Sequence, residues 1–211
     1  AEASKPPSAR PVSDRDAAAI ERMVIYRDAS VIAIDKPQGL PVQGGPGITR
    51  HVDGMLDALR FGYEERPRLV HRLDKDTSGV LLLARNAKAA AFFSNQFAGR
   101  EAEKSYWALT VGVPKIPAGT IDAPIGKQPG TGGEKMHIDE ENGAAAKTRY
   151  RVVDRAGQRA AWVELEPLTG RTHQLRVHMA AIGHPIVGDP VYSRCRKLPL
   201  ALPGQALHAF Q

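Results

Sequence analysis

The strongest constraint on the fold lies between residues 71 and 84, where a dense polar segment runs through one glycine into an apolar run. The polar part reads His-Arg-Leu-Asp-Lys-Asp-Thr-Ser, and the apolar run Val80–Ala84 follows directly after Gly79. This junction predicts a tight turn that leads into a buried β-strand.

Asp74 is the residue of this turn with the greatest chemical interest. Arg72 precedes it by two positions and Lys75 follows it directly, so opposite charge favours the ionised carboxylate. An ionised, positioned carboxylate can act as a nucleophile or a general base. Alternatively, Asp74, Thr77 and Ser78 only satisfy backbone groups of the turn. Local chemistry leaves both interpretations open.

Strand-like and helix-like patterns alternate along the rest of the chain. Strands are predicted over residues 23–26, 31–35, 104–111, 120–125, 146–154 and 161–166, and helices over 50–61, 87–98 and 173–182. In the strand 104–111, Trp107, Leu109 and Val111 share one face. If this larger apolar set packs the core, Tyr106 points the opposite way, into a cleft or onto a half-exposed sheet face.

A second dense polar cluster spans residues 167–179. Thr172 is the predicted N-cap of the helix 173–182, and the buried stripe of this helix comprises Leu175, Met179 and Ile182. Arg171 lies directly before the cap, where its guanidinium can reach an anion at the helix N-terminus.

Two histidines of this cluster are candidate ligands. His173 and His178 are five residues apart and therefore do not share a helix face as a metal-binding pair would. We expect one of them to be a hydrogen-bonding group near the site and the other to be structural. The sequence therefore predicts no metal site here.

Composition indicates which kind of binding partner and which cellular compartment suit the chain. Lys and Arg number 29 against 23 Asp and Glu, a formal charge of +6, which suits a polyanionic partner such as nucleic acid. The single cysteine, Cys195, excludes an internal disulfide and favours a cytoplasmic setting. Neither a membrane span nor a signal peptide is found in the sequence.

The first 22 residues contain three prolines among small and charged residues, so a linker or arm is expected over residues 1–22. The folded domain is then expected over residues 23–211. Because the chain starts at Ala1 rather than Met, we interpret it as a fragment that lacks an upstream part.

Taken together, the two polar clusters resemble the RluA family of pseudouridine synthases. The resemblance rests on five motifs in the family's order: Lys36-Pro37, His71–Gly79, Lys104–Tyr106, Gly170–His178 and Gly183–Asp189. Five ordered motifs are far more specific than any single one. The segments 42–45 and 50–53 are most similar to the type that modifies large-subunit ribosomal RNA, RluC.

The resemblance implies a role for each matching residue. Asp74 would be the essential carboxylate, and Arg171 would pair with it and favour its ionised form. Tyr106 would lie against the flipped uracil and is also a candidate base. Leu175 would pack beside the uracil, and Arg72 would hold the flipped nucleotide or fill the space it leaves.

His71 and Thr77 belong to the implied substrate site, with Thr77 also shaping the turn. The implied fold is an α/β domain with a bent, mostly antiparallel mixed sheet, flanking helices and a central basic cleft. The implied reaction is isomerisation of uridine to pseudouridine in ribosomal RNA by a monomer, without a metal or organic cofactor.

Two departures and two alternatives accompany the resemblance. The small S4 RNA-binding domain that usually precedes the RluC-type catalytic domain has no match here, and the chain is expected to end before the family's last strand. The same chemistry on transfer RNA is one alternative. A non-catalytic RNA-binding or ribosome assembly factor is the other.

Overall fold

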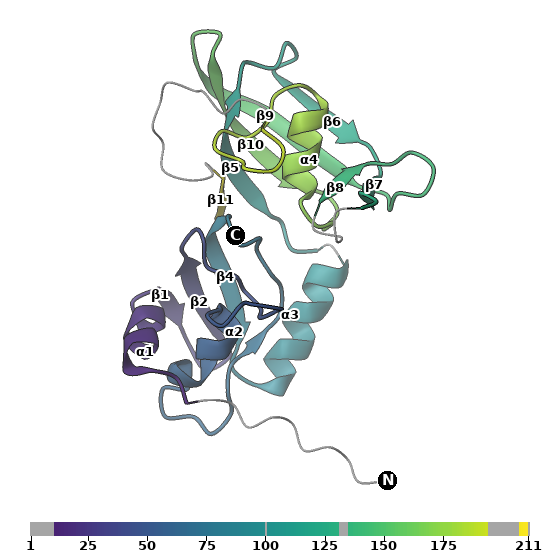
Figure 1. Ribbon diagram of the computed structural model, residues 1–211. Helices are drawn as coiled ribbons and strands as arrows, with labels where there is room; N and C mark the ends of the chain where they lie inside the picture. Colours follow the sequence, from purple (N-terminus) through teal and green to yellow (C-terminus); the bar gives the residue numbers. More distant parts are fainter. Residues whose placement is uncertain (1–10, 100, 131–134, 194–206, 211) are drawn as a thin grey trace.

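A nine-stranded sheet runs through both halves of the computed structural model, which describes residues 11–99, 101–130, 135–193 and 207–210 (Figure 1). The strands lie in the order β1 (Val24–Arg27), β2 (Val31–Lys36), β4 (Ser78–Ala84), β11 (Leu207–Phe210), β5 (Ser105–Val111), β10 (Ala160–Pro167), β9 (Lys147–Ala156) and β6 (Ala118–Asp122). The short β3 (Arg68–Leu69) also pairs with β4. All these pairings are antiparallel except that of β11 with β4. The predicted mixed, mostly antiparallel sheet is confirmed.

The N-terminal half is built on the predicted hairpin of β1 and β2. Asp28 closes its turn, because Oδ1 accepts the N–H groups of Ser30 and Val31 at 2.7 and 2.8 Å. Strand β2 then pairs with β4, the apolar run that follows the polar turn. Leu81 and Leu83 of β4 are fully buried, as the sequence predicts for this strand.

Helices pack against this half of the sheet. They are α1 (Asp14–Glu21), α2 (Val52–Met55) and the 3₁₀ helix η1 (Leu56–Leu59). The expectation of a linker or arm through Arg22 is wrong for α1, because Ile20 is fully buried in the same core as Leu81. A single well-placed isoleucine on a short helix anchors a segment whose average composition resembles a linker.

The predicted helix over residues 50–61 forms as two shorter pieces. His51 caps α2, since its Nδ1 accepts the N–H of Gly54 at 3.0 Å. After Met55 the chain tightens into η1, and Phe61 and Gly62 then take positive φ angles, which end the helical run.

The C-terminal half places α4 (Gln174–Ala181) against β9 and β10. Its core includes Val163, Leu165 and Met179, all fully buried. A small hairpin of β7 (Ile125–Lys127) and β8 (Met136–Ile138) lies beside α4, and α3 (Ala87–Gly99) links β4 to β5. As predicted, Asn86 caps α3, with Oδ1 accepting the N–H of Ala89 at 2.8 Å.

In β5 the face with Trp107, which was expected to pack against the core, is the outer face of the sheet. Trp107 is 38% exposed and meets Trp162 edge to face on the outside of the sheet. The opposite face carries the buried Ala108 and Thr110, and Tyr106 contacts both the N-terminal and the C-terminal cores. Ala108 on this inner face lies in the same core as Leu175, Met179 and Ile186.

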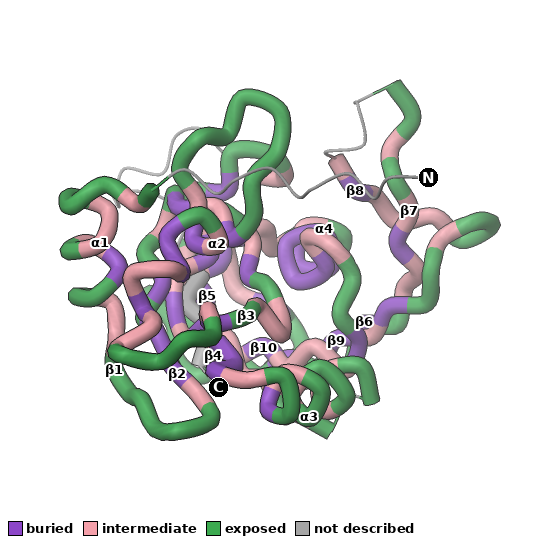
Figure 2. Tube along the Cα trace, turned by 90° about the horizontal axis from the view of Figure 1, so that it is seen from below, coloured by how far each residue is buried: buried purple, intermediate pink, exposed green. Residues whose placement is uncertain are grey.

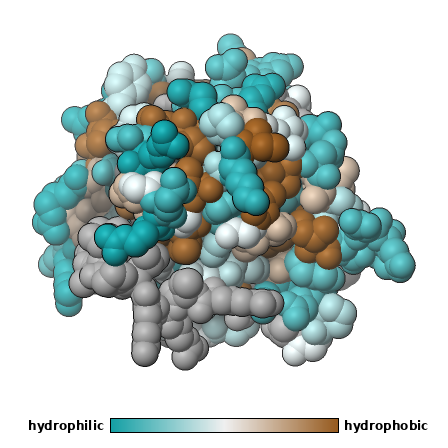
Figure 3. Space-filling view, turned by 90° about the horizontal axis from the view of Figure 1, so that it is seen from above, coloured by the Kyte–Doolittle hydropathy of each residue, from teal (hydrophilic) through white to brown (hydrophobic). Residues whose placement is uncertain are grey.

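Buried residues follow the strands and the inner sides of α2 and α4, while the connecting loops are exposed (Figure 2). Seen from above, hydrophobic patches are separated by hydrophilic side chains, the mixed surface of a domain in contact with water (Figure 3). None of the helices in the described ranges combines the length and apolar character needed to cross a membrane.

Candidate active site

Hydrogen bonds hold the turn that carries Asp74 in a fixed shape. The N–H of Thr77 donates to the carbonyl of Asp74 at 3.1 Å, and the N–H of Gly39 donates to the carbonyl of Lys75 at 2.9 Å. Gly79 then takes φ = 119°, a left-handed backbone that suits glycine, and β4 continues into the core. The predicted turn and strand are therefore confirmed.

A fully buried lysine, Lys36, donates hydrogen bonds to backbone carbonyls of this turn and of the loop beside it. Lys36 Nζ donates to the carbonyls of Pro37, Leu40 and Lys75, at 2.9, 2.9 and 3.1 Å. Burial lowers the pKa of Lys36 to about 8, against the opposing effect of Asp76 and Asp74. An ammonium group offers three N–H donors, which match the three carbonyl acceptors, so the charged form fits this position at neutral pH.

His71 anchors the other end of the turn. Its Nε2 accepts the N–H of Leu82 from β4 at 2.9 Å, and its ring stacks on Phe97 of α3 with the centroids 4.2 Å apart. Burial, and to a smaller extent the charge of Lys104, lower the pKa of His71 to about 4. At neutral pH the His71 ring is therefore uncharged and packs between the turn, the sheet and α3.

The opposite wall of the site comes from α4 and the loop before it. Arg176 approaches Asp74, with Nη1 and Oδ2 3.5 Å apart, although the Arg176 side chain is only 4% exposed. Asp189 holds the same guanidinium in a two-point contact, at 2.8 Å from Nε and 3.0 Å from Nη2. These two bonds leave both N–H groups of Nη1, the atom that faces Asp74.

The pairing of Arg171 with Asp74 is corrected by this geometry. Arg171 donates from Nε to the carbonyl of Ala145 at 3.1 Å, on the exposed rim, and Arg176 occupies the expected position beside Asp74. Five residues further along, Arg176 lies on the buried side of α4, whereas Arg171 precedes the helix. An arginine between the buried Leu175 and Met179 needs a charged partner, which is the signal that could have identified it.

The expected N-cap is corrected as well. His173, not Thr172, occupies the N-cap of α4, with φ = 55° and no side-chain cap bond. The Thr172 hydroxyl instead accepts from Nη2 of Arg72 at 3.0 Å, which links the Asp74 turn to the start of α4.

The two histidines divide their roles as the sequence indicated. His173 Nε2 lies 3.9 Å from Asp74 Oδ2, at the site. His178 is fully buried and structural: Nε2 donates to the carbonyl of Ala123 at 2.9 Å, and Nδ1 meets Thr148 Oγ1 at 2.8 Å. Across the described ranges, no group of three or more His, Cys, Asp or Glu side chains is placed to hold a metal ion.

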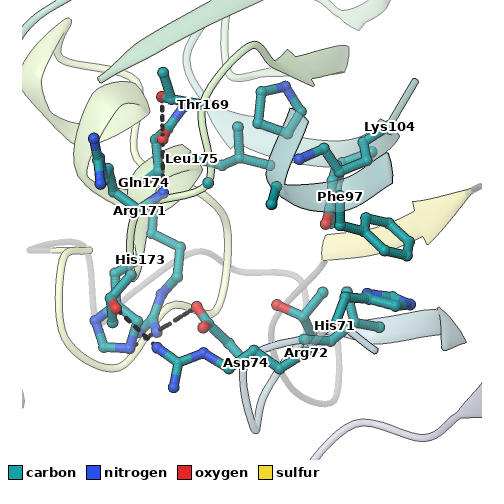
Figure 4. A pocket seen from close by; sticks show the side chains of 18 of the residues that line it. His71, Arg72, Asp74, Phe97, Lys104, Thr169, Arg171, His173, Gln174 and Leu175 are labelled. Atoms are coloured by element: carbon teal, nitrogen blue, oxygen red, sulfur yellow. Dashed lines mark hydrogen bonds and ion pairs between the residues drawn. The ribbon is translucent and has the colours of Figure 1, made fainter. Parts of the chain in front are cut away.

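These two walls enclose a cavity of about 370 Å³. All seven site residues predicted from the sequence line it, namely His71, Arg72, Asp74, Thr77, Tyr106, Arg171 and Leu175. Figure 4 shows Asp74, Arg72 and His173 gathered at one end, with Phe97 and Lys104 at another. Phe97, Lys104 and Arg176 were not predicted from the sequence as parts of the site.

Tyr106 and Leu175 supply the apolar part of the cavity. Burial and the nearby Asp74 charge raise the pKa of Tyr106 well above its ordinary value. The Tyr106 hydroxyl therefore keeps its proton at neutral pH, which suits a stacking ring better than a base.

In its chemistry, the cavity offers one carboxylate beside a buried guanidinium, an apolar slot with an aromatic ring, and cationic groups at the rim. A planar, uncharged ring fits the slot, and an anionic backbone fits the rim. A carboxylate held at the centre can bond to, or stabilise, an electron-poor carbon.

Comparison with known proteins gives a consistent result. The family model described as RNA pseudouridylate synthase matches residues 30–181. RNA pseudouridine synthase 4, mitochondrial, of Arabidopsis thaliana is 40% identical over 202 residues, covering 85% of this chain and 42% of the relative. Ribosomal large subunit pseudouridine synthase D of Pseudomonas aeruginosa is 41% identical over 208 residues, covering 90% of this chain and 62% of the relative. The chain thus spans about half the length of these curated relatives.

Among solved structures, human RNA pseudouridylate synthase domain containing 4 superposes with a TM-score of 0.76 at 33% identity. The match covers 91% of this chain and 84% of the human chain. The likeness therefore extends over both halves of the sheet and the cavity between them.

Proposed function

Because the chain belongs to the RNA pseudouridylate synthase family, we propose that it isomerises uridine to pseudouridine in RNA, with Asp74 as the catalytic carboxylate. The observation that carries the assignment of Asp74 is its position in the cavity, 3.5 Å from the buried Arg176 guanidinium. A neighbouring positive charge favours the ionised carboxylate that the chemistry needs.

The reaction exchanges one bond at the ribose for another. The N1–C1′ bond breaks, the uracil turns, and C5 bonds to C1′; the C5 proton is lost and N1 gains a proton. As N1 departs, positive charge develops at the ribose, and Asp74 supports this step either by bonding to C1′ or by removing a ribose proton. Both routes use a single ionised carboxylate.

The target nucleotide must leave its stack to reach Asp74. Extrusion costs a few kcal/mol, and stacking on an aromatic ring returns about 1–3 kcal/mol per base. Tyr106 supplies that ring, Leu175 lines the same slot, and Arg72 and Arg171 on the exposed rim can contact phosphates. The +6 charge of the chain agrees with an RNA partner.

We propose large-subunit ribosomal RNA as the substrate, supported by the Pseudomonas relative that carries this target in its name. Tritium release from RNA labelled at uracil C5 tests both the chemistry and the target. Release is expected from ribosomal RNA transcripts, and release from transfer RNA transcripts instead would move the proposal to that substrate.

Asp74→Asn should abolish tritium release, because an amide can neither attack C1′ nor accept a proton. Asp76→Asn is the matched control, since Asp76 lies in the same turn and does not line the cavity. Equal release by Asp74→Asn and the wild type would remove Asp74 from the mechanism. RNA binding without release by the wild-type protein would indicate a binding factor.

A further inference from the structure

Two hydrogen bonds and one longer polar contact lead from β8 to Asp74. The backbone N–H of Met136 in β8 donates to the hydroxyl of Tyr192 at 2.9 Å. The same hydroxyl lies 2.8 Å from Nδ1 of His173. The other ring nitrogen of His173, Nε2, faces Oδ2 of Asp74 at 3.9 Å.

The donors and acceptors of these contacts favour one tautomer of His173. A backbone N–H only donates, so Met136 occupies one acceptor position on the Tyr192 oxygen, and the hydroxyl proton of Tyr192 is available for His173. Nδ1 is then the acceptor, and the proton of the neutral ring sits on Nε2, directed at Asp74.

The charges around His173 agree with a neutral ring. Burial lowers its pKa, the carboxylates of Asp74 and Asp189 raise it, and Arg176 and Arg72 lower it. The first of these effects is the largest, so the neutral form dominates at neutral pH.

The backbone of His173 is held in a conformation that its residue type disfavours. Its φ of 55° and ψ of 18° are left-handed, and within the described residues only Phe61 is a further non-glycine residue with positive φ. Such conformations persist where the surroundings impose them, and they concentrate at functional sites. The His173 ring lies beside Asp74 (Figure 4), and its Nδ1 meets the Tyr192 hydroxyl.

From these observations we infer that His173 is a positioning residue of Asp74, oriented by Tyr192. Arg176 and His173 then hold the carboxylate from two directions, and each donor is itself fixed, the first by Asp189 and the second by Tyr192. Catalytic contacts of this length, here 3.5 and 3.9 Å, commonly tighten in the substrate complex. The kinetic consequence of this inference rests on the proposed function.

Nitrogen NMR of ¹⁵N-histidine-labelled protein tests the tautomer without any substrate. His173 is expected as the Nε2–H form in the wild type, and as a mixture of both forms in Tyr192→Phe, which keeps the ring but loses the hydroxyl. His178 is the internal control, because its own bonds to Thr148 and Ala123 are unchanged. An Nδ1–H tautomer, or a tautomer insensitive to Tyr192→Phe, overturns the inference.

The proton spectrum tests the contact with Asp74 in the same samples. Asp74→Ala should move the Nε2–H resonance of His173 upfield, since the negative charge 3.9 Å from Nε2 is lost. An unmoved resonance overturns the contact.

Single-turnover isomerisation tests the consequence for catalysis. Tyr192→Phe should lower the rate constant about tenfold while the Kd for RNA stays unchanged, as expected when the hydrogen bond that orients His173 is lost. A loss confined to Kd, or an unchanged rate, overturns the positioning role. Absence of turnover in the wild type would instead refute the proposed function, and the two NMR results would then decide the tautomer and the contact independently.

Discussion

Single residues around Asp74 carry several roles that their types alone do not suggest. Lys36 is a fully buried lysine that acts as a structural clamp, with three backbone carbonyls as its partners. His71 is a neutral wedge with one backbone partner and one aromatic partner. Both act on the shape of the turn rather than on the reacting atoms.

Lys36→Met should lower the free energy of unfolding by about 3 kcal/mol or more. The methionine fills similar space but leaves three carbonyl acceptors without their donor, and a buried unsatisfied acceptor costs about 1–3 kcal/mol. Chemical denaturation measures the effect. Lys75→Met, at an exposed lysine of the same turn, should change the stability by less than about 0.5 kcal/mol; equal losses in the two variants would contradict the clamp.

His71 predicts a loss of stability in acid. Its pKa is about 4 in the folded protein against 6.5 when exposed, so the unfolded chain binds more protons between these values. The free energy of unfolding therefore falls as the pH drops from 6.5 to 4, by at most about 1.4 kcal/mol per pH unit from this group. His71→Gln keeps an acceptor for Leu82 near the position of Nε2 and should show a shallower decline; parallel curves for both proteins would exclude His71 as the source.

Among the elements, α4 decides the geometry of the site. One side of the helix is fixed in the protein by Gln174, whose Nε2 donates to the carbonyl of Lys147 and whose Oε1 accepts from Thr169 at 2.6 Å. Its first turn then presents His173 and Arg176 to Asp74. A helix fixed by buried hydrogen bonds holds these donors more precisely than a loop would.

His173→Gly should separate stability from activity at this element. Glycine relieves the left-handed strain at φ = 55°, which offsets the lost bond to Tyr192, so the stability should stay within about 1 kcal/mol of the wild type. The isomerisation rate should fall about tenfold if His173 positions Asp74. Thermal unfolding and single-turnover assays on one preparation provide both values, and a large loss of stability with full activity would reverse this assignment.

Sequence patterns predicted most of the elements and the lining of the cavity, and the failures have physical causes. Motif order brought Asp74, Tyr106 and Leu175 to one cavity. The family resemblance implied Arg171 as the partner of Asp74, but the helical turn carries Arg176 there instead. The apolar count of Trp107, Leu109 and Val111 misjudged β5, because the core lies on the opposite face, where Ala108 packs with Leu175 and Met179.

For the molecule as a whole, RNA binding depends more on where the positive charges lie than on the net charge. Arg149 and Arg151 form cross-strand ion pairs with Glu166 and Glu164, whereas the rim arginines Arg72 and Arg171 bond to the neutral oxygens of Thr172 and Ala145. The rim therefore presents positive charge to a phosphate backbone.

RNA affinity should depend on salt through these rim arginines. Arg72→Ala or Arg171→Ala should each reduce the slope of log Kobs against log salt by about 0.7 if each neutralises one phosphate of a single strand. Filter binding across a range of salt concentrations gives the slope. Arg151→Ala, in a variant that also carries Glu164→Ala to keep the net charge, should leave the slope unchanged, and equal changes in all variants would place the RNA elsewhere.

The position of β11 in the sheet has a consequence for synthesis on the ribosome. Residues 207–210 pair with β4 on one side and β5 on the other, so the last described strand joins the two halves. Each half can pair its own hairpins as it emerges, because those contacts are local in sequence. The cavity draws its walls from both halves. A nascent chain therefore carries Asp74 and Arg176 before the strand that unites their supports, and the two walls of the cavity can be joined only after Leu207–Phe210 has been synthesised.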